Sequence, residues 1–250
     1  RFARRSHSDL GRSHQIMTRV VAVVQARMGS SRFPGKMLAK LGDQELLSWV
    51  LTRVCNAKEL DQVVLATSTS RDDDQLVEAA SSFKILVVRG SRDDVLDRFT
   101  QAAKESTADL VVRVCADNPF VAAEEIDRLV VAHQAGDFDY SCNHQQRLDN
   151  RYADGFGAEI ISTALLNKIS NLTSQASHRE HVTSYIWDNS SKFKIQAVDA
   201  PSDLAFPEVK LDIDTPEDLQ ELNEFVKKFA VTTASGAAEI VKGFIKFKNS

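Results

Sequence analysis

Short apolar runs alternate with stretches of helical periodicity along the first half of the chain. Residues 19–26 (RVVAVVQA) form the first run, and its β-branched valines are typical of a strand buried on both faces. Residues 45–57 then place apolar side chains on one helical face: Leu46, Leu47, Val50, Leu51 and Val54. The same order repeats three times, with predicted strands at 62–67, 84–88 and 109–114 and predicted helices at 73–82, 94–104 and 123–135.

Strands and helices that alternate at this spacing indicate right-handed βαβ units on a mostly parallel sheet. The second half of the chain is less regular. Its pattern predicts strands at 138–142, 158–161, 194–198 and 208–211, and helices at 163–170, 178–188 and 216–228. We therefore expect one α/β domain over residues 17–229, with a small lobe in its second half.

The two ends of the chain lack this pattern. Residues 1–16 are basic and polar and have no apolar core of the kind found in signal peptides, so we interpret them as a leader, a tag or a disordered arm. Residues 230–250 form a tail that can add one more helix, although Thr-Thr-Ala-Ser-Gly is a weak helix start.

Composition excludes several classes of protein. With 31 Lys and Arg against 35 Asp and Glu, the formal net charge is −4, which argues against a general nucleic-acid binder. No apolar run approaches the ~20 residues of a membrane span. The three cysteines, Cys55, Cys115 and Cys142, include no close pair, so structural zinc is not expected and a reducing compartment fits best. We expect a soluble cytoplasmic protein.

The loop after the first predicted strand is the first candidate site. Residues 25–36 contain two arginines, one lysine, two glycines and two serines, a composition that suits phosphate binding. A Walker A loop does not fit, because five residues rather than four separate Gly29 from Gly35, and Met37 replaces the Ser or Thr that binds magnesium. A solvated basic turn is the alternative, but the position beyond a strand's carboxyl end favours a ligand site.

Acidic residues follow two later strands. Asp117 comes directly after the fourth strand, where it either anchors a divalent cation or makes an Asx turn or helix cap. Thr215 and Pro216 read as a helix cap and first turn, which leaves Asp212 and Asp214 without a structural role. Because alternating carboxylates that leave a strand face one side, these acids and Asp117 are candidates to hold magnesium against a triphosphate.

Three other segments carry weaker signals. Residues 89–98 follow the third strand as a ligand loop or a capped helix. The run 178–181 (HREH) lacks metal-binding spacing, and we interpret it as a helix start with Arg179 pointing to a substrate or a partner chain. No histidine is placed to activate Cys115, so a thiol nucleophile is not expected.

Six ordered motifs occur at residues 25–36, 89–98, 116–119, 154–159, 179–183 and 211–219. Together they resemble the sugar-activating cytidylyltransferases, which include the CMP-KDO and CMP-sialate synthetases and, most similar of all, the spore-coat-polysaccharide type. The resemblance covers about residues 18–228. It implies an α/β nucleotide-diphospho-sugar transferase fold of three layers, close to the GT-A type, and a homodimer.

The implied activity is transfer of CMP from CTP to an acidic sugar with magnesium and release of pyrophosphate, in the biosynthesis of a surface polysaccharide or glycan. By position, the resemblance implies three groups of residues. The nucleotide side comprises Ala26, Arg27, Gly29, Ser30, Arg32, Lys36 and Arg89, of which Arg27 and Lys36 would act in catalysis together with Asp117 and Asp214. The metal ligands would be Asp117, Asp214 and Asp212, and the sugar side would contain Glu159, Arg179 and His181.

Two departures from the family pattern are visible. Cys115 stands where CMP-KDO synthetases carry Gln, and Gly157 stands where sialate enzymes tend to carry Asp, which argues against a sialate-type sugar. Two other functions stay open: a GT-A glycosyltransferase that consumes a nucleotide sugar, and a non-catalytic nucleotide-binding subunit. A guanylyltransferase for the molybdenum cofactor shares the fold but has a shorter glycine-rich loop.

Overall fold

The computed structural model describes residues 18–144 and 148–250, so the expected leader at 1–16 lies outside the described residues. The strands are β1 (Val20–Gln25), β2 (Lys40–Leu41), β3 (Gln44–Glu45), β4 (Gln62–Ser68), β5 (Leu86–Gly90), β6 (Leu110–Cys115), β7 (Tyr140–Cys142), β8 (Glu159–Ser162) and β9 (Ile195–Ala197). The α-helices are α1 (Leu46–Val54), α2 (Asp74–Ala80), α3 (Val95–Glu105), α4 (Ala123–Gln134), α5 (Thr163–Leu172), α6 (Ala176–Glu180), α7 (Ser184–Asp188), α8 (Pro216–Phe229) and α9 (Ala237–Lys248).

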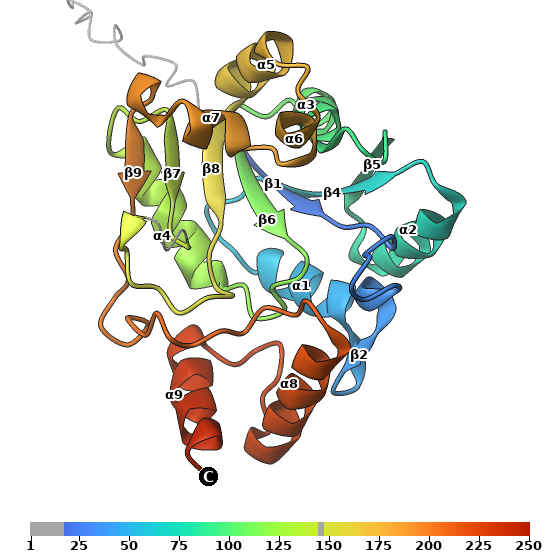
Figure 1. Cartoon of the computed structure of the whole chain (residues 1–250), viewed down its shortest axis with the longest axis vertical. Coiled ribbons are helices and arrows are strands. Elements are labelled where there is room, and N and C mark those ends of the chain that lie inside the picture. The colour runs from blue at the N-terminus through green and yellow to red at the C-terminus, as the bar shows by residue number, and fades with distance from the viewer. Residues whose placement is uncertain (1–17, 145–147) are drawn as a thin grey trace, which may run out of the picture.

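Seven of the strands form one sheet in the order β5-β4-β1-β6-β8-β7-β9 (Figure 1). β1 pairs in parallel with both β4 and β6, and β4 pairs in parallel with β5. β8 runs antiparallel to its neighbours β6 and β7. The mostly parallel α/β fold that the alternation predicted is therefore confirmed, and β1 and β6 place their carboxyl ends side by side at the centre of the sheet.

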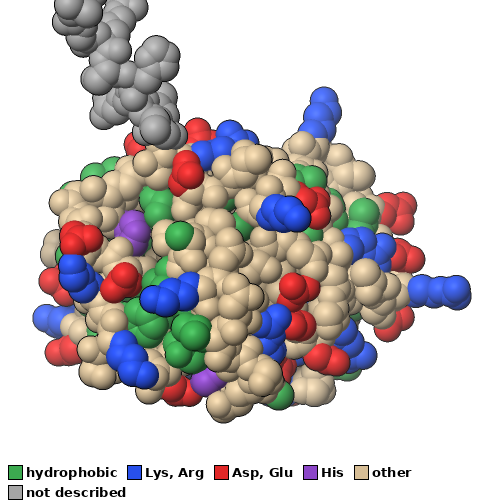
Figure 2. Space-filling view, turned by 90° about the horizontal axis from the view of Figure 1, so that it is seen from above, with side chains coloured by type: hydrophobic (Ala, Val, Ile, Leu, Met, Phe, Trp, Pro, Cys, Tyr) green, Lys and Arg blue, Asp and Glu red, His purple; other side chains and the backbone are tan. Residues whose placement is uncertain are grey.

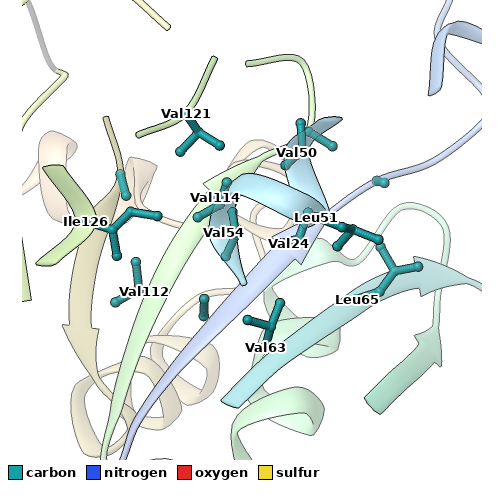
Figure 3. Packing of buried hydrophobic residues seen from close by; sticks show 14 of the residues in the cluster. Val24, Val50, Leu51, Val54, Val63, Leu65, Val112, Val114, Val121 and Ile126 are labelled. Atoms are coloured by element: carbon teal, nitrogen blue, oxygen red, sulfur yellow. The ribbon is translucent and has the colours of Figure 1, made fainter. Parts of the chain in front are cut away.

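The central strand divides its side chains between two helix layers, because successive residues of a strand point to opposite faces. Val20, Ala22 and Val24 pack in the cluster that contains α1, α2 and α4, whereas Val21 and Val23 pack with α3 and α5. Figure 3 shows the first cluster, in which side chains of α1 lie over β1, β4 and β6. The first five of the six β1 residues are at most 2% exposed, so the strand is held from both sides.

Helices α8 and α9 pack on one another at one end of the molecule (Figure 1). The ring of Phe225 on α8 is fully buried, with its centroid 5.2 Å from Phe244 and 5.7 Å from Phe247 on α9, and 6.3 Å from Phe120. The tail that begins at 230 thus supplies a helix whose aromatic face joins the core.

The predicted helix over 178–188 is wrong in one respect, because two short helices, α6 and α7, replace it. His181 between them is extended (φ −108°, ψ 93°). Val182 is 1% exposed, and the hydroxyl of Thr183 donates to the buried carboxylate of Glu159. These tertiary contacts of two β-branched residues interrupt the helix.

The predicted strand over 208–211 is also wrong. This segment makes a single bridge between Lys210 and Asp154 and is otherwise irregular. Its apolar residues Val209 and Leu211 are buried all the same, against the cluster that contains α8 and α9. The alternation of polar and apolar residues at 208–211 thus correctly indicated which side chains are buried, but the segment does not form the ladder of hydrogen bonds that defines a strand.

Within the described ranges, every helix is too short or too polar to span a membrane. On the face shown in Figure 2, acidic and basic side chains are interspersed.

We predict that Phe225→Ala lowers the free energy of unfolding by about 3–5 kcal/mol, because it leaves a cavity among rings that cannot close over it. Urea denaturation at neutral pH measures this change. Leu172→Ala is the control, since Leu172 is 56% exposed and should change the same quantity by about 0.5 kcal/mol or less. Equal effects of the two substitutions would contradict the assignment of α9 to the core.

Candidate active site

The loop after β1 folds back on itself through one carbonyl. The Met28 oxygen accepts hydrogen bonds from the amides of Ser30 (2.9 Å) and Gly35 (3.2 Å). Gly35 has φ 75°, in the left-handed region that favours glycine, and it begins a 3₁₀ turn over Lys36–Leu38. The reversal directs Lys36 back beneath the carboxyl ends of the strands.

The ammonium group of Lys36 lies at the centre of the candidate site. Its Nζ donates to the Ile213 carbonyl at 2.6 Å and lies 3.7 Å from Asp214 Oδ1 and 4.0 Å from Asp117 Oδ2. Lys36 is only 8% exposed. A buried cation needs such partners, because its transfer out of water is costly unless it is paired.

The two carboxylates reach Lys36 from segments far apart in the sequence. The Asp117 carbonyl accepts the Ile213 amide at 2.9 Å, which fastens the loop after β6 to the segment before α8. Asp218 in the first turn of α8 accepts the amides of Asp214 (2.9 Å) and Thr215 (2.7 Å). Burial acts to raise the Asp218 pKa, but these two amides outweigh it and the pKa is lowered. The capping box of α8 therefore sets the position of Asp214.

Asp212 completes an acidic cluster. Its pKa is raised, first by partial burial and then by the carboxylates of Asp154, Asp214 and Asp117. Within the described part of the chain, no three His, Cys, Asp or Glu side chains are arranged to hold a metal. Carboxylate oxygens suit magnesium, and one or two of them commonly hold the ion together with substrate phosphates. Asp117 and Asp214, which both lie within 4.0 Å of Lys36 Nζ, supply donors of this kind.

The other cations of the nucleotide side pair with different carboxylates. Arg32 is 65% exposed at its side chain and pairs with Asp214 Oδ2 at 2.8 Å, so it joins the Lys36 cluster. Arg27 pairs with Glu180 at 3.1 Å. Arg89 instead donates to the carbonyls of Ser68 and Ser70 and pairs with Asp74 at 2.6 Å.

The small residues expected on the nucleotide side shape the loop. The Ala26 amide continues the pairing with β4 through the Ala66 carbonyl at 3.3 Å, and Ala26 is 3% exposed. The Ser30 hydroxyl accepts the Phe33 amide at 3.2 Å. At Gly29 a Cβ would lie 2.8 Å from the guanidinium of Arg92, so the chain passes close beneath that side chain.

The three residues expected on the sugar side differ in exposure. Glu159 is 1% exposed and contacts Arg113 at 2.7 Å. Burial acts to raise the Glu159 pKa, but the charges of Arg113 and His144 outweigh it and hold the pKa well below its usual range. Arg179 is paired with Asp94 at 2.6 Å, whereas His181 is exposed.

Two supporting residues carried no sequence signal of their role. Asp73 was predicted as the first residue of a helix, but it is 2% exposed and accepts the amides of Met28 (2.8 Å) and Ser68 (3.1 Å). It therefore fastens the nucleotide loop to β4. Arg113 lies in the apolar run of β6, and only the pairing of β6 with β8 brings it beside Glu159.

Cys115 is the thiol that lies next to the candidate site in the sequence. Burial is the main cause that raises its pKa to about 12, and the Asp117 and Glu159 carboxylates add to it. These surroundings favour the protonated thiol, which is the less nucleophilic form.

We predict that Glu159→Gln destabilises the protein by about 3–5 kcal/mol at neutral pH, because Arg113 is left buried without a countercharge. A carboxylate whose folded pKa is depressed adds stability that is present above its unfolded pKa of about 4.5 and is lost as the pH falls below that value. Urea denaturation at pH 7 and at pH 4 should therefore show a smaller gap between wild type and variant at the lower pH. A gap that widens on acidification would contradict this account.

Comparison with known proteins identifies the family. The cytidylyltransferase family model matches residues 21–242. The spore coat polysaccharide biosynthesis protein SpsF of Bacillus subtilis is 32% identical over 232 residues, which cover 90% of this chain and 93% of SpsF. The 3-deoxy-manno-octulosonate cytidylyltransferase of Bdellovibrio bacteriovorus is 36% identical over 113 residues, 44% of each chain. A solved cytidylyltransferase from Leptospira borgpetersenii superposes with a TM-score of 0.85 at 29% identity, covering 93% of this chain and 96% of that one. The chain belongs to the cytidylyltransferase family and is a nucleotidyltransferase.

Proposed function

We propose that this enzyme activates an acidic sugar by transferring CMP from CTP, with magnesium as the cofactor and pyrophosphate as the second product. The observation that carries the proposal is the meeting of Lys36 and Arg32 with Asp117 and Asp214 at the carboxyl ends of β1 and β6. Ligands of open α/β sheets bind at this edge. Cations beside carboxylates suit a triphosphate that arrives with a divalent ion.

The reaction needs no covalent intermediate. A hydroxyl of the sugar attacks the α-phosphorus of CTP in line, the bond from that phosphorus to the bridging oxygen breaks, and pyrophosphate leaves with that electron pair. The proton of the hydroxyl passes to solvent. Positioning and neutralisation of charge dominate transfers of this kind. Arg27, Arg32 and Lys36 would hold the phosphates and offset the charge that develops on pyrophosphate.

Asp117 and Asp214 are the proposed ligands of magnesium, and Asp212 stands beside them. When bound, the ion supplies positive charge to phosphate oxygens. The protein arranges these two carboxylates before the ion binds. The α8 capping box orients Asp214, and Lys36 keeps Asp117 and Asp214 close together despite their like charges.

The acceptor and the cellular setting rest on relatives. SpsF carries a name from spore coat polysaccharide biosynthesis, and the Bdellovibrio relative is named for an octulosonate, which is a sugar acid. These names support an acidic sugar and a role in surface polysaccharide or glycan biosynthesis. Glu159, Arg179 and His181 remain the candidates for the sugar side, and His181 is the exposed one of the three. A cytoplasmic homodimer completes the proposal.

Pyrophosphate release with magnesium tests the function directly. Each of the four nucleoside triphosphates is paired with a panel of octulosonic and nonulosonic acids. Release with CTP and one acid would support the proposal and name the acceptor. CTP binding without release of pyrophosphate across the whole panel would contradict the proposal and favour a non-catalytic subunit. In a separate assay with a nucleotide sugar as donor, transfer of the sugar would favour a glycosyltransferase.

We predict that Asp117→Asn lowers turnover by at least a hundredfold while the fold stays intact, because an amide binds magnesium more weakly and the phosphates then lack the ion's positive charge. Steady-state pyrophosphate release and circular dichroism measure the two quantities. Asp137→Asn is the matched control, since Asp137 is 94% exposed and pairs with Lys194 at the surface. Normal turnover of Asp117→Asn would refute the ligand assignment.

A further inference from the structure

The last two residues of helix α6 bind two different parts of the protein. Arg179 contacts Asp94, the N-cap of α3, and Ser170 of α5. Glu180 pairs with Arg27 in the loop after β1. This inference rests on the proposed function, because it takes Arg27 as a phosphate ligand.

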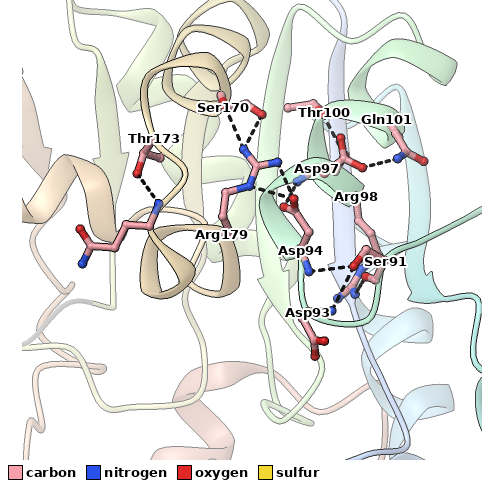
Figure 4. Close-up of polar contacts among 11 residues, drawn as sticks. Ser91, Asp93, Asp94, Asp97, Arg98, Thr100, Gln101, Ser170, Thr173 and Arg179 are labelled. Carbon is pink, nitrogen blue, oxygen red and sulfur yellow. Dashed lines mark hydrogen bonds and ion pairs between the residues drawn. The ribbon is translucent and has the colours of Figure 1, made fainter.

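All three guanidinium nitrogens of Arg179 are engaged within the protein (Figure 4). Nε and Nη2 donate to Asp94 Oδ2 at 2.8 and 2.6 Å, and Nη1 donates to the Ser170 carbonyl at 2.9 Å and the Ser170 hydroxyl at 3.0 Å. Such a fork of bonds fixes the side chain in one orientation. Arg179 is therefore unsuited to bind a sugar carboxylate unless it leaves Asp94.

Asp94 is itself a fixed anchor. It is the N-cap of α3, where its Oδ1 accepts the Asp97 amide at 2.9 Å, and its own amide donates to the Ser91 hydroxyl at 3.2 Å. The fully buried Arg98 supports this turn by donating to the carbonyls of Ser91 and Arg92. The Asp94–Arg179 pair thus ties α6 to a rigid part of the domain.

Glu180 extends from this fixed helix to the nucleotide loop. Its Oε1 accepts a hydrogen bond from Arg27 Nη2 at 3.1 Å, while Arg27 Nη1 donates to the Arg92 carbonyl at 3.4 Å. The Glu180 carboxylate is therefore paired with Arg27, the residue that the proposed function assigns to phosphate binding.

We propose that Asp94 and Arg179 are a positioning pair that holds Glu180 against Arg27, so that α6 couples nucleotide binding to the acceptor side of the site. Glu180 competes with the triphosphate for Arg27. When CTP takes Arg27, the phosphate charge repels the Glu180 carboxylate, and this side chain at the end of α6, next to the exposed His181, leaves Arg27.

The experiment measures the dissociation constant of CTP with magnesium by calorimetry, without an acceptor. Glu180→Gln should bind CTP about two- to fivefold more tightly than wild type, the range that a partly exposed ion pair of 0.5–1 kcal/mol gives. Asp94→Asn and Arg179→Gln should shift affinity in the same direction, because each frees α6. Asparagine still caps a helix, so Asp94→Asn keeps α3 intact.

Coupling predicts that the double variant Asp94→Asn/Arg179→Gln binds CTP no more tightly than either single variant. It also predicts that both single variants raise the KM of the acceptor equally. Asp137→Asn is the matched control: it removes a surface carboxylate that pairs with Lys194 and touches neither α6 nor Asp94, so CTP affinity should not change.

Weaker or unchanged CTP binding by Glu180→Gln would overturn the proposal, and this exposed variant is expected to fold whatever the others do. An acceptor KM raised by Arg179→Gln alone would instead make Arg179 a sugar ligand and overturn the positioning role. Failure of the wild type to bind CTP would overturn the proposed function itself. Normal CTP binding by the wild type, with the same affinity in all variants, would overturn only the role of α6.

Discussion

The buried ammonium of Lys36 is the interaction on which the rest of the site depends. A charged group that is 8% exposed must find acceptors within the protein, and Lys36 finds them in the Ile213 carbonyl, Asp117 and Asp214. These partners come from the loop after β6 and from the segment before α8. One side chain of the loop after β1 therefore joins three parts of the chain at the edge of the sheet where ligands bind.

The second half of the molecule supplies the counterions. Asp214 pairs with Arg32 and Lys36, and Glu180 pairs with Arg27, so each cation of the loop after β1 faces a carboxylate from the later sequence. Two helices set these carboxylates in place: α8 through its capping box and α6 through Arg179. The site is thus electrostatically balanced without ligand, and a nucleotide must exchange these contacts for its own.

Periodicity predicted most of the fold, because a strand such as β1 has five apolar residues in a row and a helix such as α1 has one apolar face. It failed where tertiary contacts overrode local pattern, as at Val182 and Thr183, which break a helix, and at 208–211, where buried residues form no strand.

For the candidate site, sequence reasoning brought together Lys36, Asp117 and Asp214 because each follows a strand or precedes a helix at the same edge of the sheet. The sequence did not reveal ion pairs between distant residues. Asp94 and Arg179 are 85 positions apart, and Arg113 and Glu159 are 46 apart, so spacing carries no trace of their contact. The residues were visible as motifs, but whether each faces a ligand or a protein partner depends on topology.

The central claim is that Lys36 forms the floor of a triphosphate site. The most direct test compares CTP affinity, with magnesium, of the wild type and of Lys36→Met, which keeps most of the length of the side chain and removes its charge. The account predicts a folded variant whose dissociation constant for CTP rises by about a hundredfold, the loss expected for a charge-assisted contact of roughly 3 kcal/mol. An unchanged dissociation constant in a folded variant would contradict it.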